Sequence, residues 1–131
     1  VALDPSWLAA YGASPDRLAG CAPVSGQLAC HFTYANARGA RPGQTMIDRF
    51  APLFHVRPDA PPMLLTVGDN DMPCRLEENQ LMRAALRTAG HHHHSCHVLA
   101  GRDHGGMGAG LADPHDAVTR LLLDFLRDPL S

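Results

Sequence analysis

Three short apolar runs, each followed by a glycine-containing loop, constrain the fold more than any other feature of this sequence. The runs are residues 18–24, 63–67 and 96–100. Each has the length of a buried β-strand and is too short for a typical helix. Helical patterns follow the second and the third run. Strands that alternate with helices usually pair in parallel, so we predict an α/β fold with about three parallel strands.

The helical patterns lie at residues 77–89 and in the C-terminal segment. The second pattern has apolar residues at the spacing of one buried helix face: Val118, Leu121, Leu122, Phe125 and Leu126. Asp113 is the predicted N-cap, with Pro114 at the first helical position and Asp116 at the third. Pro129 is expected to end this helix.

The remaining segments show weaker patterns. Residues 1–11 resemble the end of a helix, and residues 26–44 show no sustained period. Residues 45–50 are predicted to form a short helix with Thr45 as its N-cap. We interpret residues 26–50 as a cap or loop excursion from the sheet. Its aromatic and apolar side chains either line a substrate pocket or pack internally: Phe32, Tyr34, Met46 and Phe50.

Composition excludes several classes of function. The chain has 131 residues, of which 45% are hydrophobic and 18% are charged, so it can bury a core. No apolar run reaches the roughly 18 residues needed to cross a bilayer, and we expect no membrane span. All eleven cationic residues are Arg, against thirteen Asp and Glu, which gives a formal net charge of −2. Without a basic excess or cluster, binding to nucleic acid is not expected.

Cysteine and histidine usage indicates neither a disulfide scaffold nor a cofactor. The four cysteines are irregularly spaced and form no C-x-x-C pair, so we predict reduced thiols and a cytoplasmic location. Residues 91–94 are four consecutive histidines. Consecutive residues on a turn point in different directions, which disfavours a shared metal ion. We interpret the run as a solvated loop, and we expect no metal and no redox or nucleotide cofactor.

Two polar side chains follow successive predicted strands. Asp71 comes shortly after residues 63–67, and His104 comes shortly after residues 96–100. The carboxyl ends of parallel strands carry the functional loops of an α/β sheet. A carboxylate that orients a histidine makes a general base. A structural interpretation also exists, because Asp71 precedes Pro73 and a helix, where Asp commonly forms turns.

Beyond this pairing, much of the chain resembles the C-terminal half of the α/β-hydrolase fold, in its esterase/lipase and acyl-peptidase-like branch. The similarity is carried by residues 51–56 (APLFHV), 60–65 (APPMLL), 68–71 (GDND), 75–79 (RLEEN) and 101–107 (GRDHGGM), and by residues 4–8, 15–20 and 24–26. The resemblance implies that residues 1–131 are the C-terminal part of one hydrolase domain. It also implies that Asp71 is the acid and His104 the base of a Ser-His-Asp triad, with Asp69 as the alternative acid.

The same resemblance implies a serine hydrolase of carboxylic esters or small amides, with a small molecule as its partner. The expected G-x-S-x-G turn is absent. Ser25 is not assigned as the nucleophile, because it ends the strand that follows the expected nucleophile helix. Residue 1 is Val, and no signal-peptide pattern precedes the fold. We therefore expect a fragment whose nucleophile lies upstream of Val1.

Two alternatives stay open at this point. The chain is a non-catalytic remnant that serves as an interaction module, in which case its exposed first strand favours association with another chain. Alternatively, it is a histidine-rich metal-binding protein, for which the run at residues 91–94 is the evidence. The oligomeric state is left open.

Overall fold

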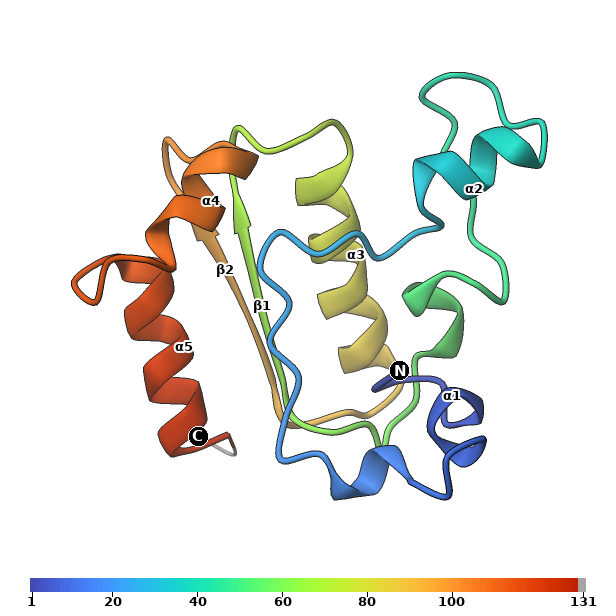
Figure 1. Cartoon of the computed structure of the whole chain (residues 1–131), viewed down its shortest axis with the longest axis horizontal. Helices are drawn as coiled ribbons and strands as arrows, with labels where there is room; N and C mark the ends of the chain where they lie inside the picture. Colours follow the sequence, from blue (N-terminus) through green and yellow to red (C-terminus); the bar gives the residue numbers. More distant parts are fainter. Residues whose placement is uncertain (130–131) are drawn as a thin grey trace.

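The computed structural model describes residues 1–129 of the chain and has a mixed α/β fold (Figure 1). In chain order the elements are α1 (Ser6–Ala9), the 3₁₀ helix η1 (Pro15–Arg17), α2 (Phe32–Ala37), the 3₁₀ helix η2 (Pro52–His55), β1 (Met63–Gly68), α3 (Arg75–Thr88), β2 (His94–Leu99), α4 (His104–Gly110) and α5 (Ala117–Arg127). The expected alternation of strands and helices is present from β1 onward.

A two-stranded parallel sheet lies at the centre of the fold. Met63 is opposite His94 at one end of the register, and Gly68 is opposite Leu99 at the other. All six residues of β1 are buried. Helix α3 packs against both strands, whereas α4 and α5 contact β1. Figure 1 shows α3 on one side of the sheet and α4 and α5 on the other.

The first predicted strand, residues 18–24, does not form a regular strand. It runs parallel to β1 and makes two isolated bridges, between Cys21 and Met63 and between Val24 and Thr66. Pro23 lies between these bridges and has no N–H to donate to a ladder, which explains why the pairing is interrupted. The prediction of three strands is therefore wrong in count, although the segment occupies the position of a third strand beside β1.

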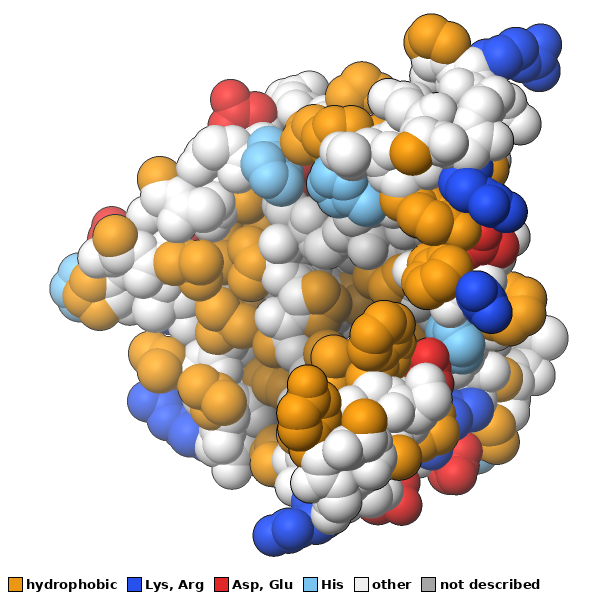
Figure 2. Space-filling model, turned by 45° about the vertical axis from the view of Figure 1, so that its right-hand side comes forward, with side chains coloured by type: hydrophobic (Ala, Val, Ile, Leu, Met, Phe, Trp, Pro, Cys, Tyr) orange, Lys and Arg blue, Asp and Glu red, His pale blue; other side chains and the backbone are white. Residues whose placement is uncertain are grey.

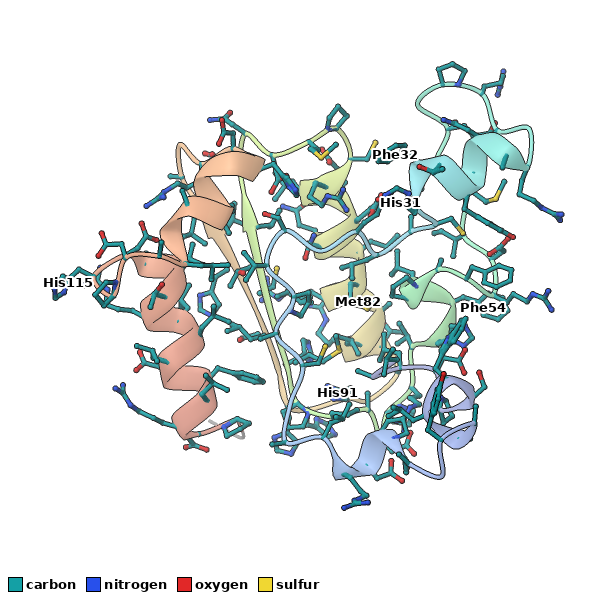
Figure 3. All side chains as sticks on the ribbon, in the orientation of Figure 1. His31, Phe32, Phe54, Met82, His91 and His115 are labelled. Atoms are coloured by element: carbon teal, nitrogen blue, oxygen red, sulfur yellow. The ribbon has the colours of Figure 1, made fainter. Side chains whose placement is uncertain are left out.

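The core lies between β1, α3 and the N-terminal segments. Its buried residues are Leu3, Leu28, Met63, Leu65, Met82 and Leu86. Leu65, Met82 and Leu86 have no exposed surface. Figure 3 shows Met82 on α3 between the sheet and the N-terminal part of the chain. Within the described residues, no helix has the length and apolar character required to span a bilayer.

Two helix predictions need correction. Residues 45–50 are not helical, and the helix of this region is α2. The last helix begins at Ala117 with Asp116 as its N-cap, so Asp113 is not the cap. The Asp116 carboxylate accepts a hydrogen bond of 2.9 Å from the Val118 backbone N–H and pairs with Arg102. The pairing with Arg102 explains why Asp116, and not Asp113, is the N-cap.

The histidine run is not simply a solvated loop. His91 is only 3% exposed, and its Nε2 lies 2.9 Å from the carbonyl oxygen of Ala60. His94 is the first residue of β2, whereas His92 and His93 are exposed. Figure 3 places His91 at the end of the sheet opposite α4. All four cysteines are free thiols, and Cys74 is exposed.

Candidate active site

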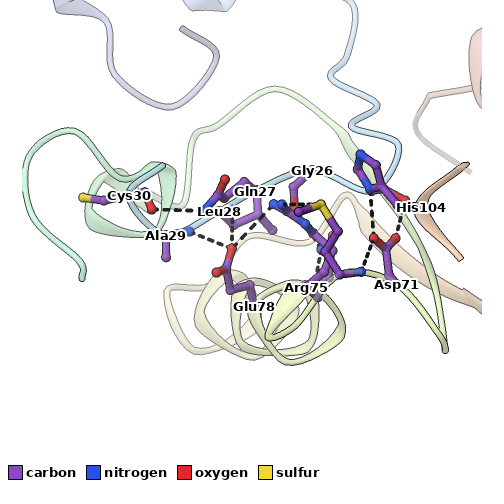
Figure 4. Close-up of polar contacts among 12 residues, drawn as sticks. Gly26, Gln27, Leu28, Ala29, Cys30, Asp71, Arg75, Glu78 and His104 are labelled. Atoms are coloured by element: carbon purple, nitrogen blue, oxygen red, sulfur yellow. Dashed lines mark hydrogen bonds and ion pairs between the residues drawn. The ribbon is translucent and has the colours of Figure 1, made fainter. Parts of the chain in front are cut away.

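The loops that follow β1 and β2 bring Asp71 and His104 into contact (Figure 4). The His104 Nδ1 lies 2.9 Å from the Asp71 Oδ1. The Asp71 side chain is fully buried, whereas the His104 side chain is 51% exposed. A buried carboxylate that holds one ring nitrogen leaves the other nitrogen of the imidazole available to a reacting group.

A close approach between two backbones makes this contact possible. A Cβ atom on Gly68 would lie 2.0 Å from the carbonyl oxygen of Arg102, so only glycine fits at the end of β1. The Arg102 carbonyl instead accepts a hydrogen bond of 3.0 Å from the Asn70 N–H. The loop that leads into His104 therefore crosses directly over the end of β1, beside Asp71.

Asp69, the alternative acid, has a different function in this arrangement. Its Oδ1 accepts a hydrogen bond of 2.7 Å from the Gly101 N–H, and its own N–H donates to the carbonyl of Leu99. These bonds connect the loop after β1 to the end of β2. The structure thus brings Asp71 to His104 and uses Asp69 to hold the two loops together.

His104 lies at the start of a helix, although its place just after a predicted strand had suggested a loop. It is the first residue of α4, and Asp103 is the N-cap. The Asp103 carboxylate accepts a hydrogen bond of 2.6 Å from the Gly106 N–H, and Arg102 donates to the Gly106 carbonyl. These side-chain contacts compensate for the low helix propensity of glycine.

The Asp71 carboxylate is surrounded by donors. Its Oδ2 accepts a hydrogen bond of 2.5 Å from the Ser25 hydroxyl, and its Oδ1 also accepts one of 2.7 Å from the Met72 N–H. Burial acts to raise the pKa of Asp71, but the hydrogen bonds from Ser25, Met72 and His104 outweigh it and hold the pKa below the ordinary value of 3.8. Asp71 is therefore ionised at neutral pH.

The contact between Ser25 and Asp71 has no local signal in the sequence, because 46 positions separate the two residues. Ser25 ends the segment that bridges to β1, and its N–H donates a 2.7 Å hydrogen bond to the Thr66 carbonyl. The serine that follows the first apolar run is thus part of the site, as a partner of the acid.

Helix α3 connects the site to the first residues of the cap. The Glu78 carboxylate accepts hydrogen bonds from the backbone N–H groups of Leu28 and Ala29, at 2.8 and 3.0 Å (Figure 4). The Asn79 amide donates to the Gly26 carbonyl at 3.1 Å. Both α3 residues are buried. Both were missed from the sequence because these partners are backbone atoms about 50 positions earlier in the chain.

Two cavities adjoin the cap. One of about 290 Å³ lies beside the loop after β1 and is lined in part by Phe32, Met72 and Arg75. The other, of about 230 Å³, is lined in part by Trp7 and Phe50. Figure 2 shows hydrophobic side chains gathered around a hollow on one face of the molecule.

The four cap residues considered as pocket residues therefore have different environments. Phe32 and Phe50 line separate cavities. Tyr34 donates a 2.9 Å hydrogen bond to Asp48 and packs at a tilt on Phe50, with 4.9 Å between ring centroids. The Met46 carbonyl accepts a hydrogen bond from the Cys30 N–H. Tyr34 therefore packs within the cap, as one of the two sequence interpretations expected.

Metal ligands do not cluster in the part of the chain that the structure describes. No group of three or more His, Cys, Asp or Glu side chains has the arrangement needed to hold a metal ion there. The contact between His104 and Asp71 is an arrangement suited to proton transfer at His104, with the Asp71 carboxylate as its charge partner.

Comparison with protein families places most of the chain in one family. The model of the prolyl oligopeptidase family, a family of α/β hydrolases, matches residues 28–130, which include Asp71 and His104. Comparison with curated proteins and with solved structures gives no significant match. Because the family model covers most of the sequence, the chain belongs to the prolyl oligopeptidase family.

Proposed function

We propose that Asp71 and His104 are the acid and the base of a serine-hydrolase triad that cleaves carboxylic esters or amides, peptide bonds included. The observation that carries this proposal is the 2.9 Å contact between a buried carboxylate and a half-exposed imidazole at the carboxyl ends of two parallel strands. Membership of the prolyl oligopeptidase family supports the same class of reaction.

The mechanism follows from the positions of the two side chains. As a serine hydroxyl attacks the substrate carbonyl, the His104 Nε2 removes its proton, and Asp71 stabilises the resulting imidazolium through Nδ1. His104 then donates that proton to the leaving alcohol or amine, which leaves an acyl-enzyme. Water, activated by the same histidine, attacks the acyl-enzyme and releases the acid.

The nucleophile in this proposal is a serine outside residues 1–131. The sequence has no G-x-S-x-G turn. Ser25 is not this nucleophile in the proposal. It is buried, and its hydroxyl donates a hydrogen bond to Asp71. A second segment must also supply the N–H groups that stabilise the oxyanion.

The segment of residues 18–25, which runs beside β1, has an open backbone edge where a further strand could pair. The Cys21 N–H donates to the carbonyl of Pro62, just before β1, and the Ser25 N–H donates to the carbonyl of Thr66 in β1. Ala22 and Val24 alternate with them, and among the described residues neither makes a backbone hydrogen bond through its N–H or its carbonyl. A further parallel strand that pairs with this edge would end on the same side of the sheet as Asp71.

The test uses the protein expressed from the complete open reading frame that contains residues 1–131. Two substrates are assayed, p-nitrophenyl acetate and a proline-containing peptide p-nitroanilide, which separate esterase from peptidase activity. We expect His104→Ala to lower kcat/KM by at least about 10³-fold. His115→Ala is the matched control, because His115 is an exposed histidine in the loop between α4 and α5 (Figure 3).

Phenylmethylsulfonyl fluoride, which modifies activated serines, tests the assignment of the nucleophile. We expect mass spectrometry to find the sulfonyl group on a serine outside residues 1–131. Modification of Ser25 would contradict the proposed division of functions. Hydrolysis of neither substrate, together with no modification, would instead favour a non-catalytic interaction module.

A further inference from the structure

We propose, on the basis of the acid–base function proposed above, that Ser25 is a positioning residue. Its hydroxyl fixes the Asp71 carboxylate in the orientation that presents Oδ1 to His104. Ser25 touches no reacting atom in this proposal and acts only through Asp71.

The two oxygens of Asp71 have different partners. Oδ1 receives the His104 ring and the Met72 N–H, whereas Ser25 is the hydrogen-bond partner of Oδ2 among the described residues. Rotation of the carboxylate would break all three bonds together. With Ser25 bonded to Oδ2, one orientation of the Asp71 carboxylate is strongly preferred. In that orientation Oδ1 faces His104.

Burial prevents water from replacing the hydroxyl easily. Ser25 is 5% exposed, and the Asp71 side chain is fully buried. A buried carboxylate oxygen that loses its donor is left unsatisfied, which is costly in a site of low dielectric constant. The carboxylate is then expected to turn towards other donors, away from the geometry that His104 requires.

The backbone at Ser25 is strained and is held in place by its neighbours. Ser25 has a φ of +50°, in the left-handed region where glycine is the least costly residue. A strained conformation persists only when its surroundings impose it. Here the Ser25 N–H is bonded to Thr66 in β1, and the next residue, Gly26, is bonded to Asn79 in α3.

Two substitutions separate the hydroxyl from the strain. Ser25→Ala removes the hydroxyl and keeps the backbone strain, whereas Ser25→Gly removes both. Ser95→Ala, in β2, is the matched control, because Ser95 lies opposite Leu64, towards the end of the sheet away from Asp71. Each variant is made in the protein from the complete open reading frame, and kcat and KM are measured with p-nitrophenyl acetate.

A second readout is the proton NMR signal of the His104 Nδ1–H, which a hydrogen bond to a carboxylate shifts strongly downfield. It is assigned by its loss in His104→Ala. We expect both Ser25 variants to weaken this signal and to lower kcat by about 10- to 100-fold with little change in KM, because small misplacements of catalytic groups have effects of that size. Ser95→Ala is expected to change neither.

Thermal unfolding distinguishes positioning from a structural function. The glycine variant is expected to be at least as stable as the alanine variant, and yet equally slow. Wild-type rates in both variants, or a loss of rate only in the less stable one, would overturn the proposal. If the wild-type protein shows the signal but hydrolyses no substrate, the proposed function fails, while the signal in the Ser25 variants still decides whether Ser25 positions Asp71.

Discussion

The carboxylate of Glu78, in the first turn of α3, accepts a hydrogen bond of 2.8 Å from the backbone N–H of Leu28, which lies 50 positions earlier in the chain. The same oxygen accepts the N–H of Ala29 at 3.0 Å. A peptide segment without secondary structure needs partners for its buried backbone groups. One Glu78 oxygen accepts two such N–H groups, and this connects the start of the cap with the helix that follows Asp71.

The first prediction concerns this connection. Glu78→Ala leaves two buried N–H groups without an acceptor, so we expect the free energy of unfolding to fall by about 2 kcal/mol or more. Glu77→Ala is the matched control, because Glu77 is the preceding, exposed acid of the same turn. Its effect should stay within about 0.5 kcal/mol. Equal effects in urea unfolding would show that the contact contributes little.

The second prediction separates the two acids of the loop after β1. Asp71→Asn keeps the shape of the side chain but removes its charge, so we expect kcat to fall by about 10³- to 10⁴-fold. Asp69→Asn keeps an oxygen that can accept the Gly101 N–H, and its kcat is expected to stay within about tenfold of the wild type. Steady-state kinetics on p-nitrophenyl acetate check both values. A larger loss in the Asp69 variant would identify Asp69 as the acid.

Part of the fold and of the candidate site was predictable from sequence patterns. Strands β1 and β2 and helix α3 were predictable, because short apolar runs and a periodic helix face reflect local burial. The meeting of Asp71 with His104 followed from their places after successive strands. Ser25 and Glu78 could not be found in this way, since each acts through a partner about 50 positions away.

Helix boundaries were less predictable, for a related reason. Residues 104–110 read HGGMGAG, a composition with low intrinsic helix propensity. The Asp103 cap and the Arg102 side chain nevertheless stabilise helix α4 there. A contact between residues further apart in the sequence, the pairing of Arg102 with Asp116, also favours Asp116 over Asp113 as the cap of α5.

The third prediction concerns acid sensitivity. The Val118 backbone N–H and then the Arg102 side chain lower the pKa of Asp116 below its ordinary value of 3.8. Near and below that value the unfolded chain binds the proton more readily, so the contribution of Asp116 to stability is present at higher pH and is lost as the pH falls. Urea unfolding between pH 7 and pH 3 should show a shallower pH dependence for Asp116→Asn than for the wild type. Parallel curves would contradict the prediction.

The last prediction contrasts two glycines. In Gly68→Ala the new methyl group meets the Arg102 carbonyl, so the loop that leads into His104 must move. We expect unfolding to become easier by about 1–3 kcal/mol, together with a loss of hydrolytic activity. Gly108 lies in α4, is exposed, and has open space where a Cβ would be placed. Gly108→Ala should therefore raise stability by up to about 1 kcal/mol through helix propensity alone. Chemical denaturation of both variants checks the opposite signs, and destabilisation by Gly108→Ala would show that α4 does not persist as a helix in solution.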